Sequence, residues 1–205
     1  MNKKMIVQPG SYPEQNGLYD PAQEKDSCGV GFVANIKGQP SHQIMLDAHH
    51  INARMDHRGG CGFEENTGDG AGVLTALPHG FFRRMAGELS VELPAPGHYA
   101  VGNIFLPQDA AERLYCQEQI EIIIAEEDQT FLVWRQVPTD PEGANIGPAS
   151  QAAQPTIEQL FIAANGVEGD AFERKLYIIR RRFSELLKRH TDHLTQGHMV
   201  YACSL

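Results

Sequence analysis

Two kinds of apolar pattern alternate along the chain, one with the period of a β-strand and one with the period of an α-helix. Short apolar runs bounded by proline, glycine or polar residues predict strands at residues 28–36, 71–78, 98–107, 130–138 and 198–205. Helical patterns lie between them, at residues 41–58, 79–89, 108–128 and 172–186. The alternation predicts a layered α/β or α+β domain, and no G-x-G-x-x-G sequence opens a helix as in a dinucleotide-binding fold.

Several helix ends can be predicted from capping residues. Ser41 is expected to cap the first helix, which should finish near His57 and Arg58 because two glycines follow. Thr156 and Gln159 match a capping box in front of the segment IEQLFIAA, after a predicted loop at residues 139–155. The last helix should pack through one apolar side, made by Phe172, Leu176, Ile179, Phe183 and Leu186. Its run Arg180, Arg181 and Arg182 predicts a solvated face.

Charge and hydropathy narrow the classes of partner. The 205 residues carry a formal net charge of -9, which disfavours binding to nucleic acid because that needs clustered Lys and Arg. No apolar run approaches the roughly 20 residues that span a bilayer, so we expect no membrane association and a cytoplasmic protein. Residues 1–27 are polar and aperiodic, which predicts a leader that packs loosely if at all.

Cys28 stands where this leader meets the first predicted strand. One interpretation is a buried core thiol, which is common for free cysteine. The other is a nucleophile, because Gly29 and Gly31 would let a planar amide approach the backbone closely. If the leader were removed, the α-amino group of Cys28, with an ordinary pKa of about 7.7 to 8.0, could act as the general base for its own thiol.

Arg58 lies at the end of a predicted helix, in the sequence RMDHRGGCG. It could be a cation that interacts with the helix dipole, or a bidentate ligand for a substrate carboxylate. A metal site made by His49, His50, His57 and Cys61 is disfavoured, since the adjacent histidines point to different helix faces, and we expect no metal.

The glycine-rich sequence TGDGAG follows. Within it, Asp69 could cap a turn or bind the amine of a ligand, and the pattern does not decide between them. The sequence lacks the Lys-Ser/Thr pair of a phosphate-binding loop.

Taken in order, CGVGFVA, RMDHRGGCG and TGDGAG resemble the start of the class II glutamine amidotransferase domain of bacterial glutamate synthase large subunits. That domain is an N-terminal-nucleophile hydrolase, so the resemblance implies an α+β fold layered as an αββα sandwich. It also implies cleavage between Ser27 and Cys28, with residues 1–27 as propeptide and residues 28–205 as part of the amidotransferase domain. Cys28 would be the catalytic nucleophile and Arg58 would bind the α-carboxylate of L-glutamine. Possible loop contacts to the substrate are Gly29, Asp69 and Gly70.

The resemblance also implies a reaction that continues beyond this domain. Glutamine would be hydrolysed to glutamate through a thioester, and the ammonia would pass to 2-oxoglutarate in a synthase domain. The intact enzyme would use FMN and an iron-sulfur cluster, neither of them held by this chain. Its partners would be the remaining domains of the large subunit and the small subunit.

The chain departs from the family pattern at its end. The Asn-Gly pair of the family's oxyanion hole and the aspartate that binds the substrate amine have no match, since Asn16-Gly17 lies in the leader and Asn165-Gly166 comes too early. We therefore expect a fragment that is incomplete at its C-terminus and is a poor glutaminase alone, because oxyanion donors are worth about 10² to 10³ in rate. Two alternatives stay open, a small stand-alone N-terminal-nucleophile amidohydrolase and a non-catalytic fragment.

Overall fold

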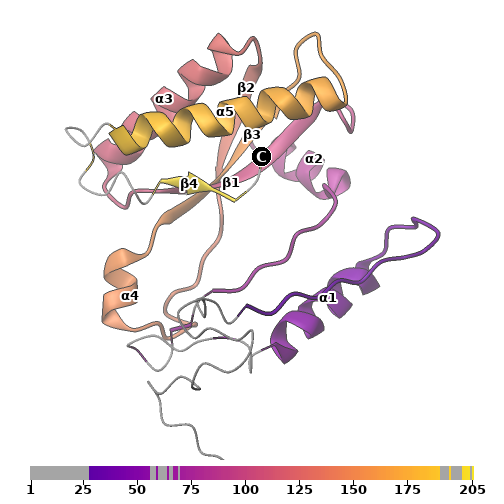
Figure 1. Ribbon diagram of the computed structural model, residues 1–205, viewed down its shortest axis with the longest axis vertical. Helices are drawn as coiled ribbons and strands as arrows, with labels where there is room; N and C mark the ends of the chain where they lie inside the picture. The colour runs from indigo at the N-terminus through magenta and orange to yellow at the C-terminus, as the bar shows by residue number, and fades with distance from the viewer. Residues whose placement is uncertain are drawn as a thin grey trace, which may run out of the picture. The chain divides into compact units, whose positions relative to one another are not determined.

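The computed structural model describes residues 28–55, 59, 64, 67–68, 70–189, 194, 200–203 and 205 (Figure 1). The chain divides into two compact units, Met1–Val73 and Leu74–Leu205, and each is described by itself. No helix among the described residues is both long enough and apolar enough to cross a membrane.

The first unit contains one helix, α1 (His42–Arg54). Ser41 caps it as predicted, because its side chain accepts a hydrogen bond from the Ile44 N–H at 3.4 Å. The helix ends at Arg54, before the predicted end, and residues 56–58 lie outside the described residues.

The predicted strand at residues 28–36 is wrong. This segment belongs to no strand, and its alternating apolar side chains are almost fully exposed, at 92% for Val30, 91% for Phe32 and 104% for Ile36. A strand needs a neighbour for its backbone N–H and C=O groups, and no described residue pairs with this segment. The same correction applies to residues 71–78, which also lie in no strand.

The second unit is built on an antiparallel sheet of β1 (Tyr99–Leu106), β2 (Thr130–Gln136), β3 (Thr156–Ala163) and β4 (Tyr201–Ala202). The spatial order is β2-β3-β1-β4, so β3 lies between two strands that precede it in the chain. β1 pairs with β3 over its full length, from Tyr99 opposite Ala163 to Leu106 opposite Thr156. The second unit is therefore an α+β arrangement of helices and an antiparallel sheet.

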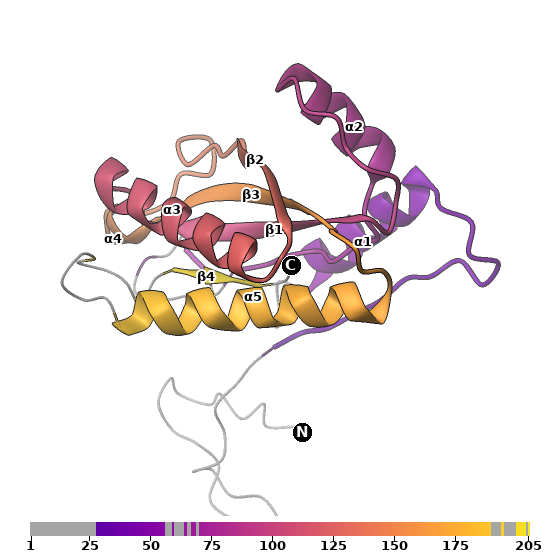
Figure 2. The same ribbon diagram turned by 90° about the horizontal axis from the view of Figure 1, so that it is seen from above.

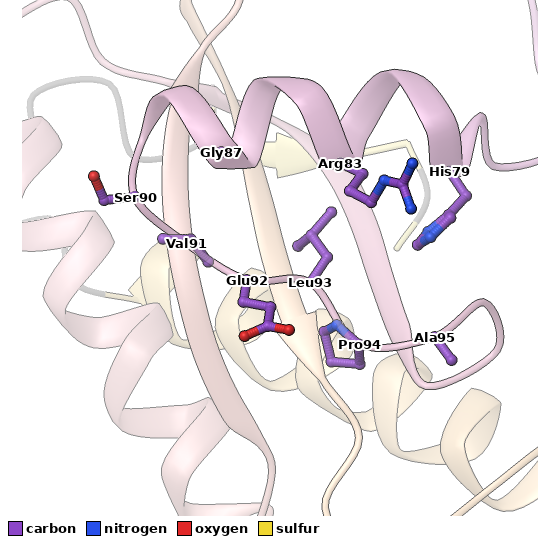
Figure 3. Close-up of a pocket in the computed structure, with 9 residues that line it drawn as sticks. All are labelled: His79, Arg83, Gly87, Ser90, Val91, Glu92, Leu93, Pro94 and Ala95. Atoms are coloured by element: carbon purple, nitrogen blue, oxygen red, sulfur yellow. The ribbon is translucent and has the colours of Figure 1, made fainter.

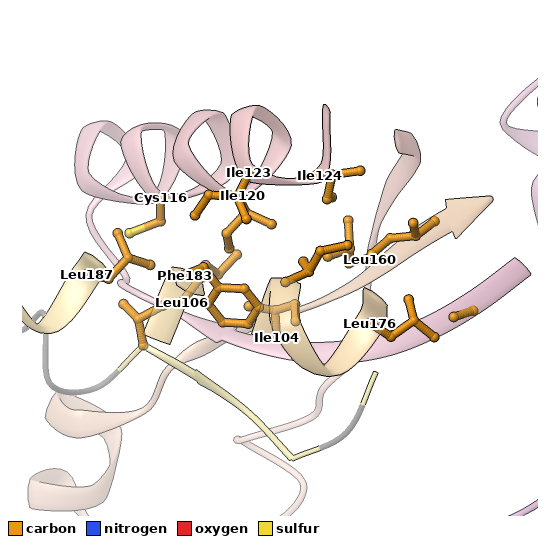
Figure 4. Packing of buried hydrophobic residues seen from close by; sticks show 14 of the residues in the cluster. Ile104, Leu106, Cys116, Ile120, Ile123, Ile124, Leu160, Leu176, Phe183 and Leu187 are labelled. Atoms are coloured by element: carbon orange, nitrogen blue, oxygen red, sulfur yellow. The ribbon is translucent and has the colours of Figure 1, made fainter. Parts of the chain in front are cut away.

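Two helices, α3 (Ala110–Glu126) and α5 (Asp170–Arg189), pack on one face of this sheet (Figure 2). Asp109 caps α3 by accepting hydrogen bonds from the N–H groups of Ala111 and Glu112, both at 2.9 Å. Figure 4 shows the apolar side chains of α3 directed toward those of α5 and the strands. The fully buried residues include Ile104, Ile120, Ile124, Leu160, Ile162, Ile179, Phe183 and Leu187. Leu187 is thus fully buried in the last turn of α5, whereas the predicted Leu186 is only partly buried.

Ion pairs join the end of α3 to α5. The Glu127 carboxylate accepts hydrogen bonds from Lys175 Nζ at 3.1 Å and from Arg182 Nη1 at 2.7 Å, and Arg182 also pairs with Glu126. Burial acts to raise the pKa of Glu127, but the hydrogen bonds from Arg182 and Lys175 outweigh it and hold the pKa below its ordinary value. Arg181 is exposed as predicted, and the Arg182 side chain is 38% exposed while it forms these ion pairs.

The opposite face of the sheet carries a second, smaller cluster. It contains Tyr99, Phe161 and Phe82, and Phe82 comes from α2 (His79–Glu88). The Phe82 and Phe161 rings meet edge to face, with centroids 5.3 Å apart. Alternate residues of β1 and β3 thus point to opposite faces, and both faces have apolar partners.

Two further elements differ from the sequence prediction. Thr156 and Gln159 lie within β3 rather than at a helix cap, and each has a strand partner on β1. The predicted loop at residues 139–155 contains a short helix, α4 (Pro148–Ala153). Gln108 fixes its end by donating hydrogen bonds to the backbone oxygens of Gln151 and Gln154, at 2.9 and 2.6 Å.

Candidate functional site

Cys28 is the first described residue of the first unit, and its side chain is exposed and free of disulfide bonding. The interpretation as a buried core thiol is therefore wrong. Gly29 beside it is exposed as well, so solvent reaches both the thiol and the adjoining backbone. An electrophilic carbon of a substrate can approach the sulfur from solution.

Gly31 sets how close this segment comes to α1. A Cβ atom at residue 31 would lie 2.6 Å from Ile51 Cγ2 and 2.7 Å from Met55 Cε, which is closer than van der Waals contact permits. The backbone can lie against the helix here because glycine has no side chain. Cys28 is thus three residues from a point where the segment is fixed by close packing.

The other predicted site residues are placed only in part. Arg58 and Asp69 lie outside the described residues. Gly70 is exposed with a φ of 96°, a conformation that favours glycine. The backbone conformation at this position explains the glycine in TGDGAG without reference to a ligand.

The other described cysteines are Cys116 and Cys203, and of these only Cys116 is buried. Cys116 is fully buried in α3, and burial, with a smaller contribution from the charge of Glu112, raises the pKa of its thiol to about 12. A thiol with that pKa is almost wholly protonated at neutral pH and is not a nucleophile. Cys203 is exposed, and its backbone oxygen accepts a hydrogen bond from Arg180 at 3.1 Å.

Among the described residues, no three His, Cys, Asp or Glu side chains are grouped closely enough to hold a metal ion. The rings of His49 and His50 are 6.2 Å apart between centroids, while His57 and Cys61 lie outside the described residues.

One pocket was not anticipated from the sequence. It lies between α2 and the chain that follows it, and we call it the α2 pocket (Figure 3). It is lined by His79, Arg83, Gly87, Ser90, Val91, Glu92, Leu93, Pro94 and Ala95. The available signal was the pairing of an arginine with a histidine four residues earlier on a helix, which places both on one side.

Comparison with known proteins gives a match that begins at Cys28. Residues 28–205 match the family model described as glutamine amidotransferases class-II. The NADPH-dependent glutamate synthase large chain of Bacillus subtilis is 40% identical over 172 residues, covering 83% of this chain and 11% of that protein. The NADH-dependent glutamate synthase of Schizosaccharomyces pombe is 38% identical over 206 residues, covering 96% of this chain and 9% of that protein. The ferredoxin-dependent glutamate synthase 1 of Arabidopsis thaliana is 37% identical, covering 94% of this chain and 12% of that protein. The chain thus spans about a tenth of the length of these relatives.

Proposed function

Since this chain belongs to the class-II glutamine amidotransferases, we propose that it is the glutaminase portion of a glutamate synthase, with Cys28 as nucleophile. The observation that carries the proposal is the start of the family match at Cys28 itself, with residues 1–27 outside it. The exposure of the Cys28 thiol in the described structure supports the same role.

The proposed reaction begins with removal of residues 1–27 as a propeptide. This cleavage frees the α-amino group of Cys28, which can take the proton of the thiol and so generate a thiolate. The sulfur attacks the side-chain amide carbon of L-glutamine, the C–N bond breaks, and ammonia departs with a proton from the amine. Water then attacks the thioester, releases glutamate and regenerates the thiol.

Substrate binding is assigned to the segments that follow Cys28. Arg58 binds the α-carboxylate of glutamine, since a guanidinium matches a carboxylate with two parallel hydrogen bonds. Asp69 is a further loop contact to the substrate. Gly29 and Gly70 contact the substrate too, and their lack of side chains leaves room for it.

We assign the later steps to the parts of a glutamate synthase that lie outside the region matched by this chain. There, ammonia combines with 2-oxoglutarate, and FMN and an iron-sulfur cluster supply the electrons. We assign neither group to this chain, because they belong to other domains than the class-II amidotransferase domain that residues 28–205 match. The remaining large-subunit domains and a small subunit are the proposed partners, in the cytoplasm. We also propose that residues 28–205 form part of an αββα sandwich, with α3 and α5 as one helical layer.

The test combines intact mass with chemical trapping. Purified protein is incubated with glutamine and hydroxylamine, which intercepts a thioester as glutamyl hydroxamate. Processed protein, shortened by residues 1–27, should form the hydroxamate, and Cys28→Ser should abolish it. Cys203→Ser is the matched control, because Cys203 is also exposed and should be dispensable. Hydroxamate formation by Cys28→Ser, or by a chain that retains residues 1–27, would refute the proposed mechanism.

A further inference from the structure

The α2 pocket owes its shape to the way α2 ends. The N–H of Ser90 donates to Gly87 O at 3.1 Å and the N–H of Val91 donates to Ala86 O at 2.8 Å. These two bonds, with Ser90 at a φ of 59°, form the Schellman arrangement that reverses the chain after a helix. Residues 91–95 consequently return alongside α2 and form the second wall of the pocket.

Contacts with the sheet fix α2, so this pocket does not depend on a ligand for its shape. Phe82 packs edge to face on Phe161, and the Arg135 guanidinium lies 5.7 Å from the centroid of the Phe81 ring. At the start of the helix, His79 Nδ1 lies 3.0 Å from the Tyr99 hydroxyl oxygen. These contacts hold the first part of α2 on β1, β2 and β3.

The hydrogen bond to Tyr99 also orients the imidazole of His79. Tyr99 is only 3% exposed, and burial raises the pKa of its hydroxyl, so the hydroxyl keeps a proton that needs an acceptor. With His79 Nδ1 as that acceptor, the neutral imidazole carries its proton on Nε2. This N–H is then a donor that the hydrogen bond to Tyr99 leaves unused.

Arg83 supplies a positive charge to the same end of the pocket. Figure 3 shows its guanidinium next to the imidazole of His79, whereas the carboxylate of Glu92 points away from both. No ion pair within the described part of the chain involves Arg83. This end of the pocket therefore presents two donor groups, one of them charged, while the Glu92 carboxylate lies elsewhere in the lining.

The wall opposite α2 is mostly apolar, with Ser90 and Glu92 as its polar members. Val91, Leu93, Pro94 and Ala95 line it, and the pocket volume is about 560 Å³. That volume lies in the range of about 300 to 1,000 Å³ typical of small-molecule sites, in which apolar walls surround a few oriented polar groups. We propose that the α2 pocket binds a small organic carboxylate, with the carboxylate on Arg83 and His79 and the apolar body against Leu93 and Pro94.

The test uses the full chain with benzoate as the probe. Benzoate binding is detected through changes in amide chemical shifts in a ¹H–¹⁵N spectrum. Benzoate at concentrations on the order of 1 to 10 mM should shift the amides of residues 79–95, as expected for a fragment of its size. Benzamide, which has the same shape without the charge, should not. Arg83→Gln should weaken benzoate binding about tenfold or more, since it removes a charged hydrogen-bond donor.

Arg84→Gln is the matched control, because Arg84 is the neighbouring exposed arginine of the same helix and does not line the pocket. Equal loss of binding in both variants would overturn the proposal, as would equal shifts with benzamide. Inorganic phosphate that binds where benzoate does not would overturn it too, since the apolar wall would then contribute nothing. Unchanged spectra outside residues 79–95 show that each variant is folded.

The inference does not rest on the glutaminase reaction. Protein alkylated at Cys28 with iodoacetamide should bind benzoate as the unmodified protein does. Loss of benzoate binding on alkylation would contradict a separate pocket, whereas failure of the glutaminase assay would leave this result unchanged.

Discussion

Replacing Glu127 by glutamine tests the ion pairs that join α3 to α5. The Glu127 side chain is 15% exposed and accepts hydrogen bonds from both Lys175 and Arg182. Each hydrogen bond to a charged group is worth about 1.5 to 3 kcal/mol when shielded from water. Lys175 and Arg182 are 30% and 38% exposed, and screening lowers these values, so we expect Glu127→Gln to cost about 1 to 2 kcal/mol at pH 7.

The measurement is urea unfolding, monitored by the fluorescence of Trp134, the single tryptophan of the sequence. Trp134 lies on β2 and donates a hydrogen bond to Glu121 of α3 at 2.8 Å, so its fluorescence reports on the contact between sheet and helix. With a slope of about 2 kcal/mol per molar urea, the midpoint should fall by roughly 0.5 to 1 M. Glu185→Gln is the control, because the ion pairs of Glu185 are i,i+4 pairs on the helix surface and should be worth less than about 0.5 kcal/mol.

The effect should depend on pH in one direction. The pKa of Glu127 is lowered on folding from 4.5, so its contribution is fully present above that value and is lost as the pH falls through the lower folded pKa. The free energies of unfolding of the wild type and Glu127→Gln should therefore converge below pH 4.5. A difference that stays constant with pH, or a Glu127→Gln effect equal to that of Glu185→Gln, would refute the reasoning.

Three other predictions concern single residues. Iodoacetamide should alkylate Cys28 in the folded protein, while Cys116 should react only on unfolding, because Cys116 is fully buried and its thiol pKa is raised to about 12. Peptide mass mapping measures this, and alkylation of Cys116 in the folded protein would contradict it. Gly31→Ala should destabilise the packing against α1 by about 1 to 3 kcal/mol and speed hydrogen exchange in that helix. Gly72→Ala should do neither, because a Cβ atom added there has no neighbouring atom within 4 Å. Equal hydrogen exchange in the two variants would contradict the close approach at Gly31. Gln129→Ala should cost about 1 to 3 kcal/mol in urea unfolding, because its buried side chain accepts from the backbone of the β3–α5 connection at 3.1 Å; a loss below 0.5 kcal/mol would mean that this bond is dispensable.

The sequence predicted best those elements whose pattern and burial agree. The segments of α2, β1, α3, β2 and α5 were all expected close to their observed bounds. In α5 the apolar residues that repeat at helical spacing are the ones that pack on the sheet. The local pattern was sufficient for these helices because each buries one continuous stripe of apolar side chains.

Prediction failed where the backbone depends on a distant partner. Residues 28–36 alternate like a strand, yet no described strand pairs with them. Thr156 and Gln159 have the spacing of a capping box, but pairing with β1 and β2 overrides that local preference. Similar reasoning applies to α4, which is held in part by Gln108 from a distant segment.

The candidate site was predicted from motifs, and its geometry was not. Cys28 was weighed as a core thiol or a nucleophile, and its exposure removes the first interpretation. Arg58 and Asp69 remain predictions, since they lie outside the described residues. The α2 pocket could not be anticipated, because it arises from a chain reversal and a tyrosine twenty positions along the sequence from His79.

The order of strands in the sheet has a consequence for synthesis on the ribosome. Both strands that pair with β1, namely β3 and β4, come later in the chain. From the end of β1 to the end of β3 is about 60 residues, which takes roughly 3 to 12 s at about 5 to 20 residues per second. During that interval β1 leaves the ribosome with its apolar side chains and backbone groups unpaired. The nascent chain thus exposes an aggregation-prone strand for seconds, and a chaperone that binds extended apolar segments has that time in which to act on it.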